Sequence, residues 1–172
     1  MKRRIVLGLC AIGMLGLSVP SGSGIAQQKS ETAQLVGVWT LVSNVNVKKD
    51  GTTFEPFGPS PKGILTFGPK GHFSLILVRP GRPKFVSNNR LKATPEEDRE
   101  TVQNTLSLFG TYSVNEPDHS FMLKVEGSSF PNWEGSVRKY VIKSLSGDSL
   151  EYTSPPTSTG AGYADLTWKR AT

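Results

Sequence analysis

The sequence predicts an all-β, antiparallel barrel of about eight to ten strands with one inserted α-helix. Short segments of alternating apolar and polar residues recur along the chain. The 18 glycines and 12 prolines among 172 residues mark many turns between these segments. Only one stretch carries the signals that start a helix. Closing into a barrel removes the exposed edges of such a meander, and a two-sheet sandwich is the structural alternative.

The first strand is expected over residues 36–47. On one face its alternation places Gly37, Trp39, Leu41, Ser43 and Val45, and on the other Val38, Thr40, Val42 and Asn44. Asp50-Gly51 then forms a hairpin turn.

Eight further strands are expected after this turn. They cover residues 52–57, 64–67, 72–79, 111–115, 120–126, 137–145, 149–153 and 164–169. Segments rich in Gly, Pro, Ser and Asn separate them.

One helix is predicted over residues 95–109. Thr94 is its N-cap, Pro95 occupies the first helical position and Glu97 completes a capping box. Val102, Leu106 and Phe109 follow at helical spacing, and Gly110 ends the helix. We expect this helix against the barrel or across one of its mouths.

The N-terminus resembles a signal for export. Met1–Arg4 is basic, residues 5–19 are mostly apolar, and small residues precede a cleavage point after Ala26. The apolar run is shorter than the ~20 residues of a membrane span. A signal peptide over residues 1–26 is therefore expected, with an uncleaved anchor as the alternative. The protein would be exported, to the periplasm or outside the cell.

Cleavage would leave 146 residues, and the loss of Lys2, Arg3 and Arg4 would lower the net charge from +6 to +3. This smaller charge gives little support to nucleic-acid binding. Cys10 would also be lost, so no disulfide is expected in the mature chain. Because the apolar run of residues 5–19 would be removed as well, no membrane span is expected after cleavage. Residues 27–34 would form a flexible segment, or one helical turn at 31–35, before a barrel domain over residues 35–170.

The first and last strands resemble those of lipocalins and other calycins. The first carries Gly37-Val38-Trp39, and the last ends in Trp168-Lys169-Arg170. The resemblance implies that Trp39 closes one end of the barrel beside Gly37. It also implies that Arg170 packs over the Trp39 indole in a cation–π contact, with Lys169 as the second candidate.

A closer resemblance is to the bacterial and fungal lipocalin-like domain group. The matching stretches are 35–43, 56–58, 61–63, Gly71 with 73–74, 82–83, 94–97 and 130–135. Most members have no assigned activity. Members often carry His at the position of Lys124 and a Gln-x-Arg pair near Arg138, so histidine chemistry of relatives is not carried over.

Metal and cofactor chemistry has little support in this sequence. His72 and His119 are 47 positions apart, and neither has Asp, Glu or Cys at ligand spacing. We expect no metal and no cofactor.

Lys124 and Glu126 share one face of a strand. Facing inward, they would form an acid/base pair, and facing outward a solvated ion pair. Phe121, Leu123 and Val125 form the more natural core face, which favours the outward orientation.

Several residues are candidates for contact with a ligand. Arg79 and Arg82, near Lys84, form either an anion-selecting rim or a solvated loop, and Trp133 is either a lid or a packed plug. The expected ligand-binding set is Phe73, Arg79, Arg82, Tyr112, Trp133, Tyr140 and Tyr152.

The favoured function is non-enzymatic binding of a small, mainly hydrophobic molecule in the barrel cavity. One alternative is an isomerase, cyclase or hydrolase that uses Lys124, Glu126, Arg138 and Tyr140. Another is a packed barrel that serves as an interaction module of the cell envelope. An apolar cavity larger than about 300 Å³ would favour binding, ionisable groups converging in that cavity would favour catalysis, and a filled interior would leave the interaction module. The sequence makes no prediction of oligomeric state.

Overall fold

The computed structural model describes residues 30–172; the expected signal peptide, residues 1–26, lies outside this part of the chain. The elements in chain order are α1 (Glu31–Leu35), β1 (Gly37–Val47), β2 (Thr53–Phe54), β3 (Lys62–Phe67), β4 (His72–Val78), η1 (Arg90–Lys92), α2 (Pro95–Gln103), β5 (Thr105–Asn115), η2 (Glu116–Asp118), β6 (Ser120–Ser128), η3 (Pro131–Trp133), β7 (Val137–Leu145), β8 (Ser149–Thr153) and β9 (Tyr163–Arg170).

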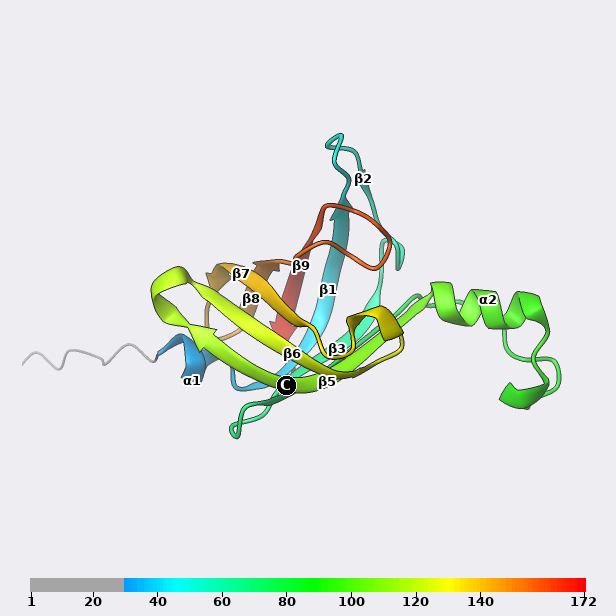
Figure 1. Cartoon of the computed structure of the whole chain (residues 1–172), viewed down its shortest axis with the longest axis horizontal. Helices are drawn as coiled ribbons and strands as arrows, with labels where there is room; N and C mark the ends of the chain where they lie inside the picture. Colours follow the sequence, from blue (N-terminus) through cyan, green and yellow to red (C-terminus); the bar gives the residue numbers. More distant parts are fainter. Residues whose placement is uncertain (1–29) are drawn as a thin grey trace, which may run out of the picture.

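The strands form a closed antiparallel barrel, which confirms the prediction. Strands β1 and β3 to β9 pair with their neighbours, and pairing of β1 with β9 closes the ring. Strand β2 pairs only with the end of β1 and forms a hairpin that projects from the barrel (Figure 1). Closure leaves no free edge in the ring, and the sandwich alternative is wrong.

Inward-facing rings fill the middle of the barrel. The Phe121 ring stacks on Tyr140 at 5.1 Å between centroids and meets Phe67 edge-on at 5.3 Å. Tyr152 contacts both Phe121 and Tyr140 edge-on. These rings separate two ends of the barrel, which we call the closed end, beside α1, and the open end, where β4 leads toward α2 (Figure 1).

The closed end is sealed by Trp39, whose side chain is fully buried. Its indole N–H donates to the Leu35 carbonyl at 2.8 Å. The Arg170 guanidinium carbon lies 4.1 Å from the indole centroid. Arg170 donates to the carbonyls of Val36 at 3.0 Å and Gln34 at 2.6 Å, whereas Lys169 is exposed.

Gly37 is required where this seal is tightest. A Cβ atom there would lie 2.5 Å from an Arg170 guanidinium nitrogen, and the φ of Gly37 is +137°. Any side chain would therefore displace Arg170 from the indole.

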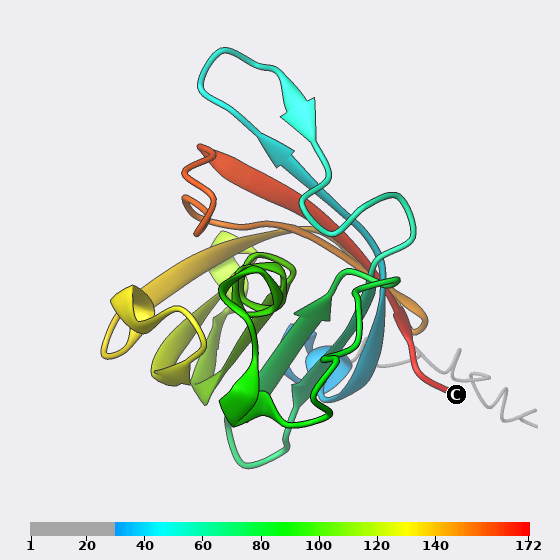
Figure 2. The same cartoon turned by 90° about the vertical axis from the view of Figure 1, so that its right-hand side faces the viewer.

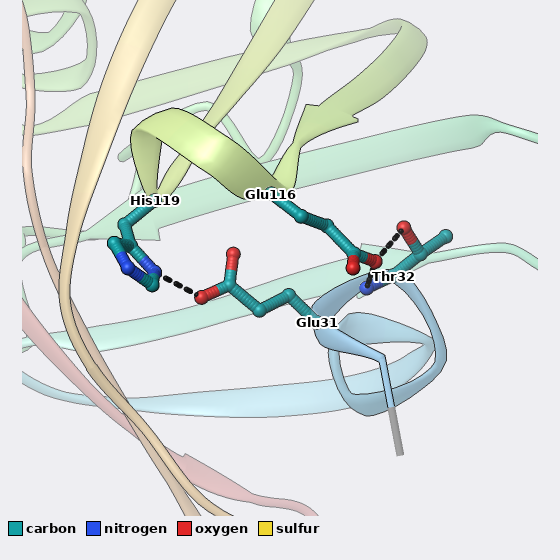
Figure 3. A network of polar contacts seen from close by, with 4 residues as sticks. All are labelled: Glu31, Thr32, Glu116 and His119. Atoms are coloured by element: carbon teal, nitrogen blue, oxygen red, sulfur yellow. Dashed lines mark hydrogen bonds and ion pairs between the residues drawn. The ribbon is translucent and has the colours of Figure 1, made fainter. Parts of the chain in front are cut away.

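Residues 31–35 form α1, which is the helical turn given above as the alternative to a flexible segment. Glu31 lies 2.6 Å from His119 Nδ1. The Thr32 hydroxyl donates to Glu116 at 3.0 Å (Figure 3). These contacts tie α1 to the turn between β5 and β6.

The predicted helix over residues 95–109 is wrong in its second half. Helix α2 has the expected capping box but ends at Gln103, and Leu106 and Phe109 belong to β5. Their spacing fits a helix, but pairing of β5 with β4 and β6 overrides it, and Leu106 and Phe109 lie on opposite faces of the strand, with Leu106 inside and Phe109 exposed. Gly110 is needed because a Cβ atom there would lie 2.0 Å from the Lys124 carbonyl oxygen.

Helix α2 also differs from its expected position. It buries none of its residues and points away from the open end rather than lying on the barrel (Figure 1). No helix within residues 30–172 has the length and hydrophobicity needed to cross a membrane.

The faces of β1 change at a β-bulge, which the simple alternation did not anticipate. The pairing with β9 shifts register between Leu41 and Ser43. Beyond this point Asn44 and Asn46 are buried, whereas Ser43 and Val45 are only half-buried. The expected shared face of Trp39, Ser43 and Val45 is therefore wrong, because one extra residue reverses every later side chain.

Candidate functional site

A cavity opens into the barrel interior at the open end. Aromatic and aliphatic side chains from several strands form most of its wall, and three longer polar side chains reach it. The rings are Phe57, Trp133, Tyr140 and Tyr152, the leucines are Leu75, Leu77, Leu106 and Leu166, and the polar groups are Asn44, Asn46 and Arg138.

The cavity continues outward into a larger hollow. The inner part offers about 50 Å³ to the centres of water-sized molecules, and the adjoining hollow about 390 Å³. Phe57, Leu106 and Thr159 line both. The barrel interior is therefore mostly filled, and the volume suited to a small molecule lies at its mouth.

The two asparagines of β1 differ in their hydrogen bonding. Asn46 Nδ2 donates to the Thr159 hydroxyl at 2.7 Å and to the Thr157 hydroxyl at 3.3 Å. Asn44 Oδ1 is buried and has no hydrogen-bond partner among the described residues. An unpaired buried acceptor costs free energy, and a donor group in the cavity would remove that cost.

Arg138 joins Trp133 at the mouth. Its guanidinium carbon lies 3.8 Å from the Trp133 ring centroid, and Nη2 donates to the Pro156 carbonyl at 2.6 Å. Arg138 Nε is buried without a partner in the described part of the chain. Two residues of the cavity wall, Asn44 and Arg138, therefore each hold a buried polar atom without a partner in the described residues.

Buried phenols complete the wall. Burial raises the pKa of Tyr140, and the nearby Arg138 charge opposes this rise. Burial also raises the pKa of Tyr152 well above its ordinary value. Both phenols therefore stay neutral at physiological pH and present hydroxyl groups, not charges.

The structure brings together only part of the expected ligand-binding set. Trp133, Tyr140 and Tyr152 line the cavity. Phe73 is instead packed near the closed end, and Tyr112 donates its hydroxyl to the Gly68 carbonyl there at 3.0 Å. The side chains of Phe73 and Tyr112 point into the barrel, as the alternation indicated. They lie near the closed end, where side chains fill the interior.

The basic residues lie outside this cavity. Arg79, Arg82 and Lys84 line a separate hollow on the outer surface beside η1. Neither Arg79 nor Arg82 lines the cavity or the hollow at its mouth, but Arg82 Nη1 donates at 2.5 Å to the hydroxyl of Thr105, which does line that hollow.

The proposed acid/base pair is also outside. Lys124 and Glu126 are exposed on the outer face of β6, while Leu123 and Val125 face the core. Of the four residues named for catalysis, only Arg138 and Tyr140 reach the cavity. The cavity lining contains no Asp, Glu, His or Lys, and residues 30–172 contain no group of three metal-binding side chains.

Asn44 and Asn46 were not anticipated as site residues. Asparagine inside a barrel strand is unusual, and their i, i+2 spacing was a signal that both share one face. The bulge that turns this face inward follows from pairing with β9 and leaves no mark in the β1 sequence.

Comparison with known proteins gives one family match and several weaker likenesses. The model of the lipocalin-like domain family matches residues 36–171. A 4'-hydroxy-3'-methoxypropiophenone carrier protein of Aspergillus oryzae is 29% identical over 108 residues, which are 56% of this chain and 95% of that protein.

Two designed proteins are similar in structure. A redesigned β-barrel has a TM-score of 0.43 and 14% identity, covering 84% of this chain and 100% of its own. A de novo designed fluorescence-activating β-barrel has a TM-score of 0.43 and 14% identity, covering 83% of this chain and 99% of its own. Similarity at this level supports no conclusion about ligands.

Proposed function

Because the chain belongs to the lipocalin-like domain family, we propose that its barrel binds and carries a small aromatic molecule at the open end. The ligand is mainly apolar and bears a hydrogen-bond donor and an acceptor. The single observation that carries this proposal is the aromatic-walled cavity lined by Asn44 and Arg138, each of which has a buried polar atom without a partner within residues 30–172.

The geometry gives each part of such a ligand a partner. The rings of Trp133 and Phe57 would cover an aromatic face at the mouth. The ring of the ligand would lie in the outer hollow, and its polar end would enter the narrow inner cavity. There, after small shifts of their side chains, Asn44 would accept from a ligand hydroxyl and Arg138 would donate to a carbonyl. Binding would thus satisfy groups that folding leaves unpaired.

The carrier protein from Aspergillus oryzae supports this class of ligand. The compound in its name has an aromatic ring, a phenolic hydroxyl and a ketone. We propose the same class, a phenolic or related aromatic carbonyl compound, for this chain.

We also propose that the barrel acts outside the cytoplasm. The basic and apolar segments of residues 1–26 support this placement. Fractionation of the host and the amino-terminal residue of the isolated protein test it: protein outside the cytoplasm with Gln27 first is expected, and protein confined to the cytoplasm would contradict the placement.

Titration calorimetry with 4'-hydroxy-3'-methoxypropiophenone as the probe tests the binding proposal. Saturable binding is expected, with quenching of Trp133 fluorescence. Asn44→Leu should weaken binding about tenfold, the effect of about 1.4 kcal/mol from one lost hydrogen bond. Propiophenone, which lacks the hydroxyl, should bind the unaltered protein more weakly for the same reason.

Lys124→Gln is the matched control, because Lys124 lies on the outer wall. It should leave the affinity unchanged. Equal loss in both variants would contradict a site at the open end. Absence of binding by a panel of phenolic and non-phenolic aromatic ketones would overturn the ligand class.

A further inference from the structure

A long segment at the open end takes no part in the barrel wall. Residues 79–104 connect β4 to β5, and we call them the arm. The arm contains η1 and α2 and lies outside the barrel (Figure 1). In the view from the open end, it projects toward the viewer (Figure 2). Its base is fixed, because the Arg79 N–H donates to the Asn104 carbonyl at 3.0 Å.

The arm exposes the most accessible large apolar side chains of the described chain. Val86 is 93% exposed, Leu91 84% and Val102 71%. Val86 and Leu91 belong to the first part of the arm, within five residues of each other, whereas Val102 lines the hollow at the mouth of the cavity.

The backbone around these side chains is ordered by the arm itself. The Val86 N–H donates to Glu97 Oε1 at 2.8 Å, and the Leu91 N–H donates to Asn89 Oδ1 at 3.0 Å. The other Glu97 oxygen accepts from the Thr94 N–H at 2.9 Å. The apolar side chains are therefore presented outward by a hydrogen-bonded turn.

The charge of the arm is divided. Its first part, residues 79–92, carries only positive charges, and none of them forms an ion pair with a carboxylate within residues 30–172. The cations are Arg79, Arg82, Lys84, Arg90 and Lys92. The carboxylates of the arm lie on α2, where Glu97 is already engaged and Glu100 accepts from Asn104 Nδ2 at 2.8 Å.

We propose that the first part of the arm docks the protein onto the surface of an anionic phospholipid bilayer. Lysine and arginine would bind lipid phosphates, and Val86 and Leu91 would enter the region beneath the headgroups. The combination of cations with exposed apolar side chains favours a bilayer over a nucleic acid. A nucleic acid would bind the cations but would leave Val86 and Leu91 in water. The inference does not depend on the ligand proposed above.

Docking by the arm would also bring the cavity mouth near the bilayer. Val102 lines the hollow that continues into the cavity, together with Phe57 and Leu106. A protein held by its arm would therefore keep its open end close to the bilayer, where apolar molecules dissolve.

Flotation of the ligand-free protein with vesicles tests the proposal. Vesicles of phosphatidylcholine with about 30% phosphatidylglycerol should bind the protein, and pure phosphatidylcholine should not. Val86→Ser with Leu91→Ser, and separately Arg90→Gln with Lys92→Gln, should each reduce binding about tenfold. A Val86→Trp variant should show a blue shift of its fluorescence on the anionic vesicles.

Lys70→Gln with Lys169→Gln is the matched control, since it removes the same charge from exposed residues at the closed end. It should keep vesicle binding. Equal loss in this control, an unshifted Val86→Trp spectrum with bound vesicles, or no flotation would overturn docking by the arm. Self-association that Val86→Ser with Leu91→Ser abolishes, without flotation, would assign the surface to a second copy instead.

Discussion

The two ends of the barrel use similar side chains in opposite ways. At the closed end, Arg170 covers Trp39 and donates to backbone carbonyls, and the indole N–H is also paired. At the open end, Arg138 covers Trp133, but its Nε has no partner in the described chain. The same cation–π pair thus seals one end and borders a cavity at the other.

This difference distinguishes a structural pair from a functional one. A sealed pair contributes to the free energy of unfolding through burial and hydrogen bonds. In a pair with an unpaired donor, part of this stabilisation is missing from the ligand-free protein. A ligand that supplies the acceptor would restore it on binding. Hydrogen-bond satisfaction, more than residue type, therefore separates the two tryptophan–arginine pairs.

Replacement of the two tryptophans should give the largest contrast. Trp39→Ala should lower the free energy of unfolding by about 3–5 kcal/mol, because a fully buried indole leaves a cavity. Trp133→Ala should cost clearly less, since Trp133 is only partly buried at the mouth. Urea denaturation of both variants measures the difference.

Ligand binding by the folded variants completes this test. Trp39→Ala should keep its affinity for the aromatic probe, and Trp133→Ala should lose affinity. A Trp39→Ala protein that folds with normal stability but no longer binds would reverse the roles of the two ends.

The closed end was more accessible to sequence reasoning than the open end. Gly37, Trp39 and Arg170 lie at strand positions that a short motif identifies, and the strand order follows from local alternation and turns. The open end depends on the β-bulge that turns Asn44 inward and on pairing that makes Leu106 part of a strand. Both arise from contacts between distant segments, which no local pattern encodes.

The buried phenols between the two ends should make stability depend on alkaline pH. Burial raises the pKa of Tyr152 well above its usual 10.0, and burial raises that of Tyr140 as well. The stabilisation is complete below the unfolded pKa near 10 and falls as pH rises above it, because the unfolded chain then loses protons that the folded chain retains. A phenol that keeps its proton in the folded state while the unfolded chain loses it contributes about 1.4 kcal/mol per pH unit.

Urea denaturation between about pH 9 and pH 11 measures this slope. Tyr152→Phe should reduce the slope, and Tyr163→Phe, at an exposed tyrosine of β9, should leave it unchanged. Identical slopes in the Tyr152→Phe variant and the unaltered protein would show that Tyr152 does not retain its proton in the folded state.

The smallest effect should come from the two asparagines of the cavity, and it should differ in sign. Asn44→Leu removes a buried amide oxygen that lacks a partner, so the free energy of unfolding should rise by about 1 kcal/mol. Asn46→Leu removes the hydrogen bonds to the Thr157 and Thr159 hydroxyls and should lower it by about 1 kcal/mol. Thermal and urea unfolding of the ligand-free variants measure both. Opposite signs would show that Asn44 is kept at a cost to stability, as a ligand-binding group would be, whereas a loss in both variants would mean that Asn44 already has a partner in the folded protein.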